Sequence, residues 1–65
     1  MAGIDTIELF YSHHCVACPE ARALLRGVTD ARPGVVAVEH DIDGPEGLAR
    51  AREYRLIAVP AFVVN

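Results

Sequence analysis

The sequence predicts a small α/β domain of order β-α-β-α-β, because three apolar runs alternate with two stretches whose apolar residues recur at helical spacing. The chain has 65 residues, so we expect one domain over residues 1–65. A domain of this size buries only about 60% of the surface that its unfolded chain exposes. Hydrophobic residues make up 52% of the sequence, which favours a compact core over disorder.

Three segments have the features of strands. Residues 4–11 alternate between apolar and polar side chains and then end in an apolar run, which is typical of a strand that becomes buried on both faces. Residues 35–42 contain a β-branched run. Residues 59–64 form a third apolar run, which the chain enters through Pro60.

Two segments between these strands are predicted as helices. Residues 16–28 place apolar side chains at helical spacing, and Pro19 falls in the first turn, where its missing N–H is not needed. Residues 46–54 repeat apolar side chains every three residues up to Tyr54, which we expect to pack in the core. This second helix is expected to have a solvated face of arginines: Arg50, Arg52 and Arg55. Acidic residues are expected to cap it and to bound the turn before it: Asp41, Asp43 and Glu46.

The charge of the chain excludes several classes of partner. The net charge is −3 at pH 7, and all six basic residues are scattered arginines, which argues against a nucleic-acid or anionic-membrane partner. No apolar run reaches the roughly 20 residues that a membrane helix needs. The first residues also lack the basic and hydrophobic regions of a secretion signal, so we expect a cytoplasmic protein.

The segment from Ser12 to Pro19 carries the chemistry of the chain. It places two thiols, Cys15 and Cys18, three residues apart at a strand-to-helix junction, where they could close a small disulfide ring or share a metal ion. The first turn of a helix directs unpaired N–H groups and a partial positive charge at the first sulfur, which favours its thiolate form. Because a thiolate is the nucleophile of disulfide exchange, the flanking strand and helix favour redox chemistry.

Three features occur together over nearly the whole chain. Cys15 and Cys18 follow the first predicted strand, residues 38–43 give the second strand an acidic end, and a hydrophobic-Pro step at Val59-Pro60 leads into the third. In this combination the chain resembles the thioredoxin superfamily, in its small, glutaredoxin-sized form. The resemblance implies that the Val59–Pro60 bond is cis and lies beside the dithiol, and that the backbone of Val59 pairs with an extended substrate segment.

The resemblance further implies a thiol:disulfide oxidoreductase that reduces protein or small-molecule disulfides. Cys15 would attack a substrate disulfide to form a mixed disulfide, and Cys18 would resolve it and leave the Cys15–Cys18 disulfide. This redox-active disulfide needs no metal or organic cofactor, but it requires an upstream reductant. His13 and His14 either favour the Cys15 thiolate through their charge or are exposed loop residues without effect.

The sequence departs from the family pattern at several positions. His14 stands where an aromatic residue often precedes the first cysteine. Leu9 and Glu39 stand where thioredoxins have a buried aspartate and a lysine, so that proton-relay pair is absent. The central dipeptide Val16-Ala17 matches neither thioredoxins nor glutaredoxins, so a redox potential cannot be carried over from either group.

Family members continue beyond the third strand through a fourth strand and a last helix, whereas this chain stops at Asn65. We therefore expect a domain that is C-terminally incomplete relative to the family. Its third strand would be an exposed edge, through which the chain could form a dimer or dock on another chain.

A metal-binding module, or a thioredoxin-fold interaction module without catalysis, is the competing interpretation. The two cysteines would then hold zinc or copper with a histidine among the other ligands: His13, His14 or His40. Adjacent histidines point in divergent directions in an extended segment and no second CxxC is present, which favours the redox interpretation. Small metallochaperone domains also have a CxxC at a helix start, but their βαββαβ order has no proline-led last strand, so Pro60 argues against them.

Overall fold

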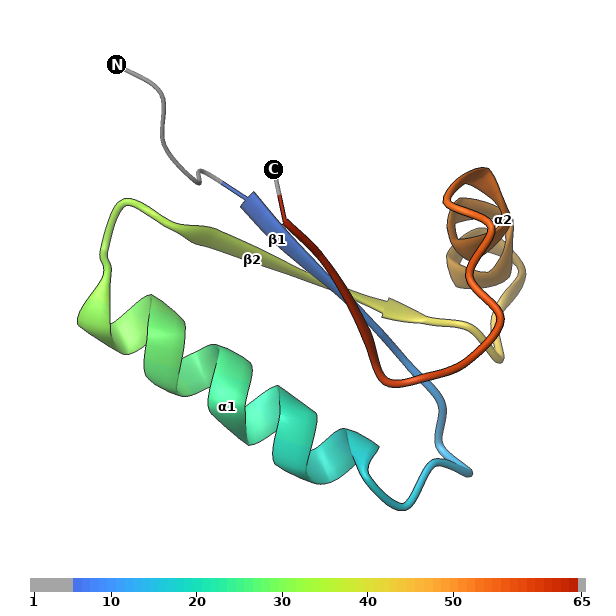
Figure 1. The fold of residues 1–65 in the computed structure, drawn as a ribbon, viewed down its shortest axis with the longest axis horizontal. Coiled ribbons are helices and arrows are strands. Elements are labelled where there is room, and N and C mark those ends of the chain that lie inside the picture. Colours follow the sequence, from blue (N-terminus) through green and yellow to red (C-terminus); the bar gives the residue numbers. More distant parts are fainter. Residues whose placement is uncertain (1–5, 65) are drawn as a thin grey trace.

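The computed structural model describes residues 6–64, which form a three-stranded sheet with helices on its two faces (Figure 1). The elements follow one another in this order: β1 (Thr6–Tyr11), α1 (Cys18–Ala31), β2 (Val36–Asp41), α2 (Pro45–Glu53) and β3 (Ala61–Val64). The predicted α/β order is therefore confirmed, although the first two residues of the predicted strand 4–11 lie outside the described residues. Neither described helix has the length and hydrophobicity that a membrane crossing requires.

β1 is the central strand of the sheet, whose strand order is β2-β1-β3. It runs parallel to β2, with Phe10 beside His40, and antiparallel to β3, with Leu9 beside Phe62. β3 is an edge strand among the described residues, as predicted. Because β1 and β2 are parallel, their carboxyl ends meet at the same edge of the sheet, and the loops that follow them are neighbours.

Alternating side chains of β1 pack toward different helices. One core cluster lies between β1 and α1: Ile7, Leu9, Ala21 and Leu25. On the other face Phe10 is fully buried, stacks on His40 with ring centroids 4.6 Å apart, and meets the ring of Tyr54 edge-on at 6.0 Å. β1 is thus covered on both faces, and Tyr54 packs against the core as predicted.

The helix boundaries differ from the predicted ones by a few residues. α1 begins at Cys18 because residues 15–17 form a tight turn, in which the N–H of Cys18 donates to the carbonyl of Cys15 at 3.4 Å. Pro19 lies in the first turn, as predicted, and the helix continues to Ala31. α2 begins at Pro45 with Gly44 as its N-cap residue.

The predicted capping of α2 by acidic side chains is wrong, because the N-cap makes no side-chain hydrogen bond. The predicted role in the turn is confirmed for Asp41, whose carboxylate accepts the N–H of Asp43 at 2.9 Å. Both side chains also bond to the loop that follows β1. Glu46 lies within the first turn of the helix, where a negative charge suits the helix dipole.

The predicted solvated arginine face is also partly wrong, because Arg50 pairs with a buried carboxylate. Glu8 is only 4% exposed, and its carboxylate accepts hydrogen bonds from the Arg50 Nε at 3.0 Å and the Tyr54 hydroxyl at 2.6 Å. His40 Nε2 lies 2.9 Å from the same carboxylate. The other arginines of the predicted face are exposed: Arg52 and Arg55.

Candidate active site

The two cysteines lie where β1 gives way to α1, and they form a disulfide with their Cα atoms 5.3 Å apart. Cys18 opens α1 and is only 1% exposed, whereas Cys15 lies in the preceding loop and is half-buried. A thiol reagent or a substrate can therefore reach the sulfur of Cys15 more easily than that of Cys18.

The segment before β3 lies against the disulfide. The Val59–Pro60 bond is cis, as the resemblance implies, and the carbonyl oxygen of Val59 lies 3.7 Å from the Sγ of Cys15. Pro60 is half-buried at this junction. The structure thus places four of the predicted site residues together, namely Cys15, Cys18, Val59 and Pro60.

Mostly apolar side chains line two hollows at and near the sulfur of Cys15. A hollow of about 430 Å³ is lined by Cys15 and its neighbours: Ser12, His14, Val16, Ala17, Ile42 and Val59. A second hollow, of about 290 Å³, shares two of these residues and has only apolar side chains: Ile42, Leu48, Ala51, Leu56, Ile57, Ala58 and Val59. Val16 is 97% exposed and Ile57 is 100% exposed, so the surface beside the disulfide is both apolar and accessible.

The two histidines before Cys15 have different surroundings. His14 is exposed and lines the hollow beside the Cys15 sulfur. The ring of His13 lies with Nε2 3.0 Å from the Asp41 carboxylate and meets Tyr11 edge-on. His14 is thus the histidine placed to approach a substrate, while His13 is bonded to the turn after β2.

A carboxylate from the turn after β2 bonds to the loop that carries Cys15. The Asp43 side chain accepts hydrogen bonds from the backbone N–H of His13 at 2.9 Å and from the hydroxyl of Ser12 at 3.1 Å. The N–H of His13, followed by the hydroxyl of Ser12, lowers the pKa of the Asp43 carboxyl below its ordinary value. Asp43 is therefore ionised wherever the protein is folded near neutral pH.

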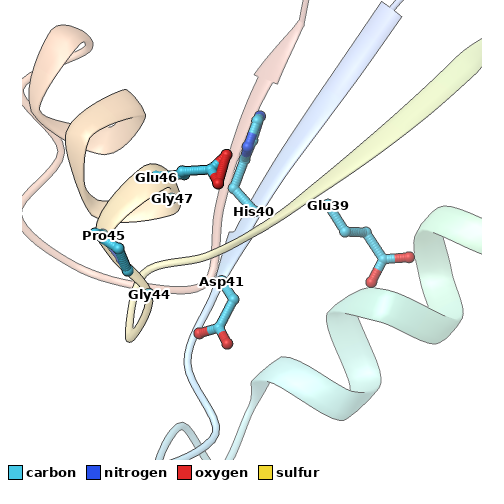
Figure 2. Close-up of a pocket in the computed structure, with 7 residues that line it drawn as sticks. All are labelled: Glu39, His40, Asp41, Gly44, Pro45, Glu46 and Gly47. Atoms are coloured by element: carbon cyan, nitrogen blue, oxygen red, sulfur yellow. The ribbon is translucent and has the colours of Figure 1, made fainter.

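Another hollow, of about 320 Å³, lies between the end of β2 and the start of α2 (Figure 2). Neither cysteine lines it. Most of its polar side chains already have partners, since Glu39 bonds Arg22, His40 bonds Glu8 and Asp41 bonds His13. This hollow therefore offers few polar side chains that could bind a ligand.

The metal site that we considered as an alternative does not assemble around the cysteines. In the described part of the chain, the ligand atoms of one group lie within 4.8 Å of one another: His13, Asp41 and Asp43. That group contains neither Cys15 nor Cys18, and His14 and His40 are also outside it. A site made of the two cysteines with a histidine is thus not supported.

Two site features were missed by the sequence analysis. The hydrogen bond between Ser12 and Asp43 joins residues that are 31 positions apart in the sequence. Asp43 was interpreted as a capping residue, and no role was predicted for Ser12. The available signal was topological, because an acidic residue directly after β2 lies near the loop after β1 whenever the two strands are parallel and adjacent.

Comparison with known proteins places these features in a family. No protein-family model matches the chain. The chain is 41% identical over 59 residues to a thioredoxin of Methanocaldococcus jannaschii, covering 91% of this chain and 68% of that protein. It is 34% identical over 59 residues to a probable thioredoxin of Archaeoglobus fulgidus, covering 91% of this chain and 64% of that protein.

A solved structure agrees with these sequence matches. The solution structure of a thioredoxin from Thermus thermophilus matches with a TM-score of 0.64 and 32% sequence identity, over 91% of this chain and 48% of that one. The chain thus spans about two thirds of the length of its curated relatives and about half of the solved structure. From its sequence identity and its fold, the chain belongs to the thioredoxin family.

Proposed function

We propose that this chain is a thiol:disulfide oxidoreductase that reduces disulfides through Cys15 and Cys18. Family membership and the cysteine pair support a thiol–disulfide redox function in general. The observation that carries the proposal is the unequal burial of the pair beside the Val59 carbonyl, with Cys15 half-buried and Cys18 1% exposed. Such an arrangement suits one attacking and one resolving thiol.

The reaction transfers two electrons to the substrate. The Cys15 thiolate attacks one sulfur of the substrate disulfide, and the other substrate sulfur leaves as a thiolate that takes up a proton. The Cys18 thiolate then attacks the Cys15 sulfur, which releases the second substrate thiol and leaves the Cys15–Cys18 disulfide. A dithiol reductant must restore the pair, and we place this cycle in the reducing cytoplasm, with no metal or organic cofactor.

We further propose that protein disulfides flanked by apolar side chains are better substrates than glutathione disulfide. Apart from Ser12, His14 and Cys15, the described residues that line the two hollows are apolar, and none of them is acidic, lysine or arginine. Glutathione carries two carboxylates and an ammonium group, for which these hollows offer no fixed counter-charge. An extended polypeptide can instead place apolar side chains on Val16 and Ile57 while its backbone lies along Val59 and Pro60.

Insulin reduction in the presence of dithiothreitol tests the proposed function. We expect wild-type protein to accelerate the reaction, Cys15→Ser to abolish the acceleration, and Cys18→Ser to accumulate a mixed disulfide with insulin, because the resolving thiol is missing. Brief iodoacetamide treatment of the reduced protein should label Cys15 before Cys18. Full turnover by Cys15→Ser, or preferential labelling of Cys18, would contradict the assignment.

We also propose that β3 mediates association of this 65-residue chain. Phe62 is 41% exposed and Val64 is 52% exposed. Phe62 pairs across the sheet with Leu9, and Val64 with Ile7, so both lie on the face that α1 covers only in part. The outer edge of β3 is free for strand pairing in the described part of the chain. Sedimentation equilibrium should show a molecular weight that rises with protein concentration, and Val64→Lys should shift the equilibrium toward monomer. One constant monomer weight over the whole series would refute this association.

A further inference from the structure

The loop that carries Cys15 has little regular structure to hold it. It leaves β1 after Tyr11 and reaches α1 only at Cys18. The turn that follows β2 lies beside it, because the two parallel strands end at the same edge of the sheet. Figure 2 shows Asp41 at this edge, turned away from His40 and toward the loop after β1.

Three consecutive backbone N–H groups of the loop depend on Asp43 and Ser12. The N–H of His13 donates to the Asp43 carboxylate at 2.9 Å. The N–H of His14 donates to the hydroxyl oxygen of Ser12 at 3.1 Å, and the N–H of Cys15 donates to the carbonyl of Ser12 at 3.2 Å. The Ser12 hydroxyl in turn donates its single hydrogen to the Asp43 carboxylate, at 3.1 and 3.2 Å from the two oxygens.

The turn that presents Asp43 is itself fixed. The N–H of Asp43 donates to one carboxylate oxygen of Asp41 at 2.9 Å, while the other oxygen lies 3.0 Å from His13 Nε2. The carbonyl of Asp41 accepts the N–H of Gly44 at 3.2 Å. The loop before Cys15 is thus joined to the rest of the domain by two carboxylates whose positions are set by the turn.

We propose that Asp43 is a positioning residue for Cys15, whose carboxylate holds the loop from Ser12 to Cys15 in the conformation that meets a substrate disulfide. The inference deepens the proposed function and rests on it. Without this acceptor the N–H of His13 and the hydroxyl of Ser12 must bond to water, and the loop gains conformations in which Cys15 is turned away from its substrate. Misplacement of a reacting group by about 1 Å can cost a hundred-fold in rate.

The decisive comparison is between Asp43→Ala and Asp43→Asn, with Asp30→Ala as a control of equal charge change. Asparagine keeps an oxygen that can accept the N–H of His13, whereas alanine keeps none. Asp30 is exposed in the last part of α1, away from the loop. We expect Asp43→Ala to lower kcat/KM for insulin about ten-fold, mainly through kcat, and Asp43→Asn to stay within about three-fold of wild type. Asp30→Ala should behave as wild type.

The rate of Cys15 alkylation by iodoacetamide, measured as a function of pH, is a second test that does not depend on reductase activity. We expect Asp43→Ala to shift this profile and Asp43→Asn to preserve it, since the amide oxygen keeps the loop in place. If the wild-type protein reduces no disulfide, the proposed reductase function is wrong. Asp43 then has no role in catalysis, whatever the alkylation profile shows. If the wild type is active and Asp43→Ala matches it in both measurements, only the positioning role is overturned.

Two further outcomes are decisive. Equal losses in Asp43→Asn and Asp43→Ala would show that the charge matters and not the hydrogen bonds, and would overturn the proposal. If Asp43→Ala fails to unfold cooperatively on heating, Ser12→Ala takes its place, because it removes only the hydroxyl between Asp43 and His14. That variant should lose about three-fold in kcat/KM; unchanged kinetics would refute the positioning role.

Discussion

Replacement of Gly47 by alanine is expected to unfold the domain or to displace α2 from the sheet. Gly47 is buried in the first part of α2, directly against the end of β2. A Cβ atom there would overlap the carbonyl oxygen of Asp41 and would lie 2.5 Å from its carbonyl carbon. These are backbone atoms, so the clash is relieved only when the helix or the turn moves.

The expected loss is large relative to the stability of so small a domain. Overpacking costs about 1–3 kcal/mol where neighbouring side chains can adjust, and more where they cannot. A chain of this length has about 3–10 kcal/mol of unfolding free energy in total. We therefore expect Gly47→Ala to lose more than about 3 kcal/mol, or to show no cooperative unfolding by circular dichroism.

Gly27→Ala is the matched control, with an expected effect of opposite sign. Gly27 is exposed within α1, and a Cβ atom there would meet nothing within 4 Å. Alanine in a helix interior is favoured over glycine by about 1 kcal/mol, so this variant should melt about 4–8 °C higher than wild type. Equal melting temperatures for wild type and Gly47→Ala would contradict the close packing of α2 on β2.

The sequence was sufficient to predict those features that depend on local patterns. Apolar alternation and β-branched runs located the three strands, and helical spacing located both ends of each helix to within three residues. Cys15 and Cys18 could be placed at a strand-to-helix junction for the same reason. Pro60 was identified as a site residue through the resemblance to the thioredoxin superfamily, in which a hydrophobic-Pro step into a strand accompanies the cysteine pair.

Features that depend on pairing between distant residues could not be predicted from local patterns. Glu8 lies between two apolar neighbours in β1, where alternation normally indicates a solvent-exposed position. It is buried because α2 covers that face and supplies Arg50, which is 42 residues away. In the same way, Asp43 was interpreted as a capping residue, because no local signal indicated that Ser12 would face it.

Replacement of Glu8 by glutamine is expected to cost about 2–3 kcal/mol of unfolding free energy at neutral pH. The side chain of Glu8 is 6% exposed and bonds to groups from β2, α2 and the residue after α2. Removing one partner of a buried ion pair generally costs about 3–5 kcal/mol. We expect the smaller loss of about 2–3 kcal/mol because the Arg50 side chain is 43% exposed. Solvent therefore screens the ion pair and can hydrate the arginine that remains.

The loss should depend on pH in a direction that identifies the carboxylate. Hydrogen bonds from Arg50 and then Tyr54 lower the pKa of Glu8 from 4.5 to about 2. When folding lowers the pKa of a carboxyl group, that group stabilises the folded protein fully at pH values above its pKa in the unfolded chain. This stabilisation is lost as the pH falls through the pKa of the group in the folded protein. The stability gap between wild type and Glu8→Gln should therefore be constant from neutral pH down to about 5, and should close between about 4.5 and 2.

Urea unfolding of both proteins across this pH range measures the gap directly, because every other titrating group is common to the two. Glu20→Gln, an exposed substitution in the first turn of α1, serves as the control for the loss of one negative charge and should change the free energy of unfolding much less than Glu8→Gln. Arg50→Met should also be less stable than wild type at neutral pH, since it leaves the buried carboxylate without its strongest donor, and its gap to wild type should close over the same pH range. A gap for Glu8→Gln that does not change with pH would show that the carboxylate of Glu8 is not held in its charged form by these hydrogen bonds, and that packing of the side chain accounts for the loss.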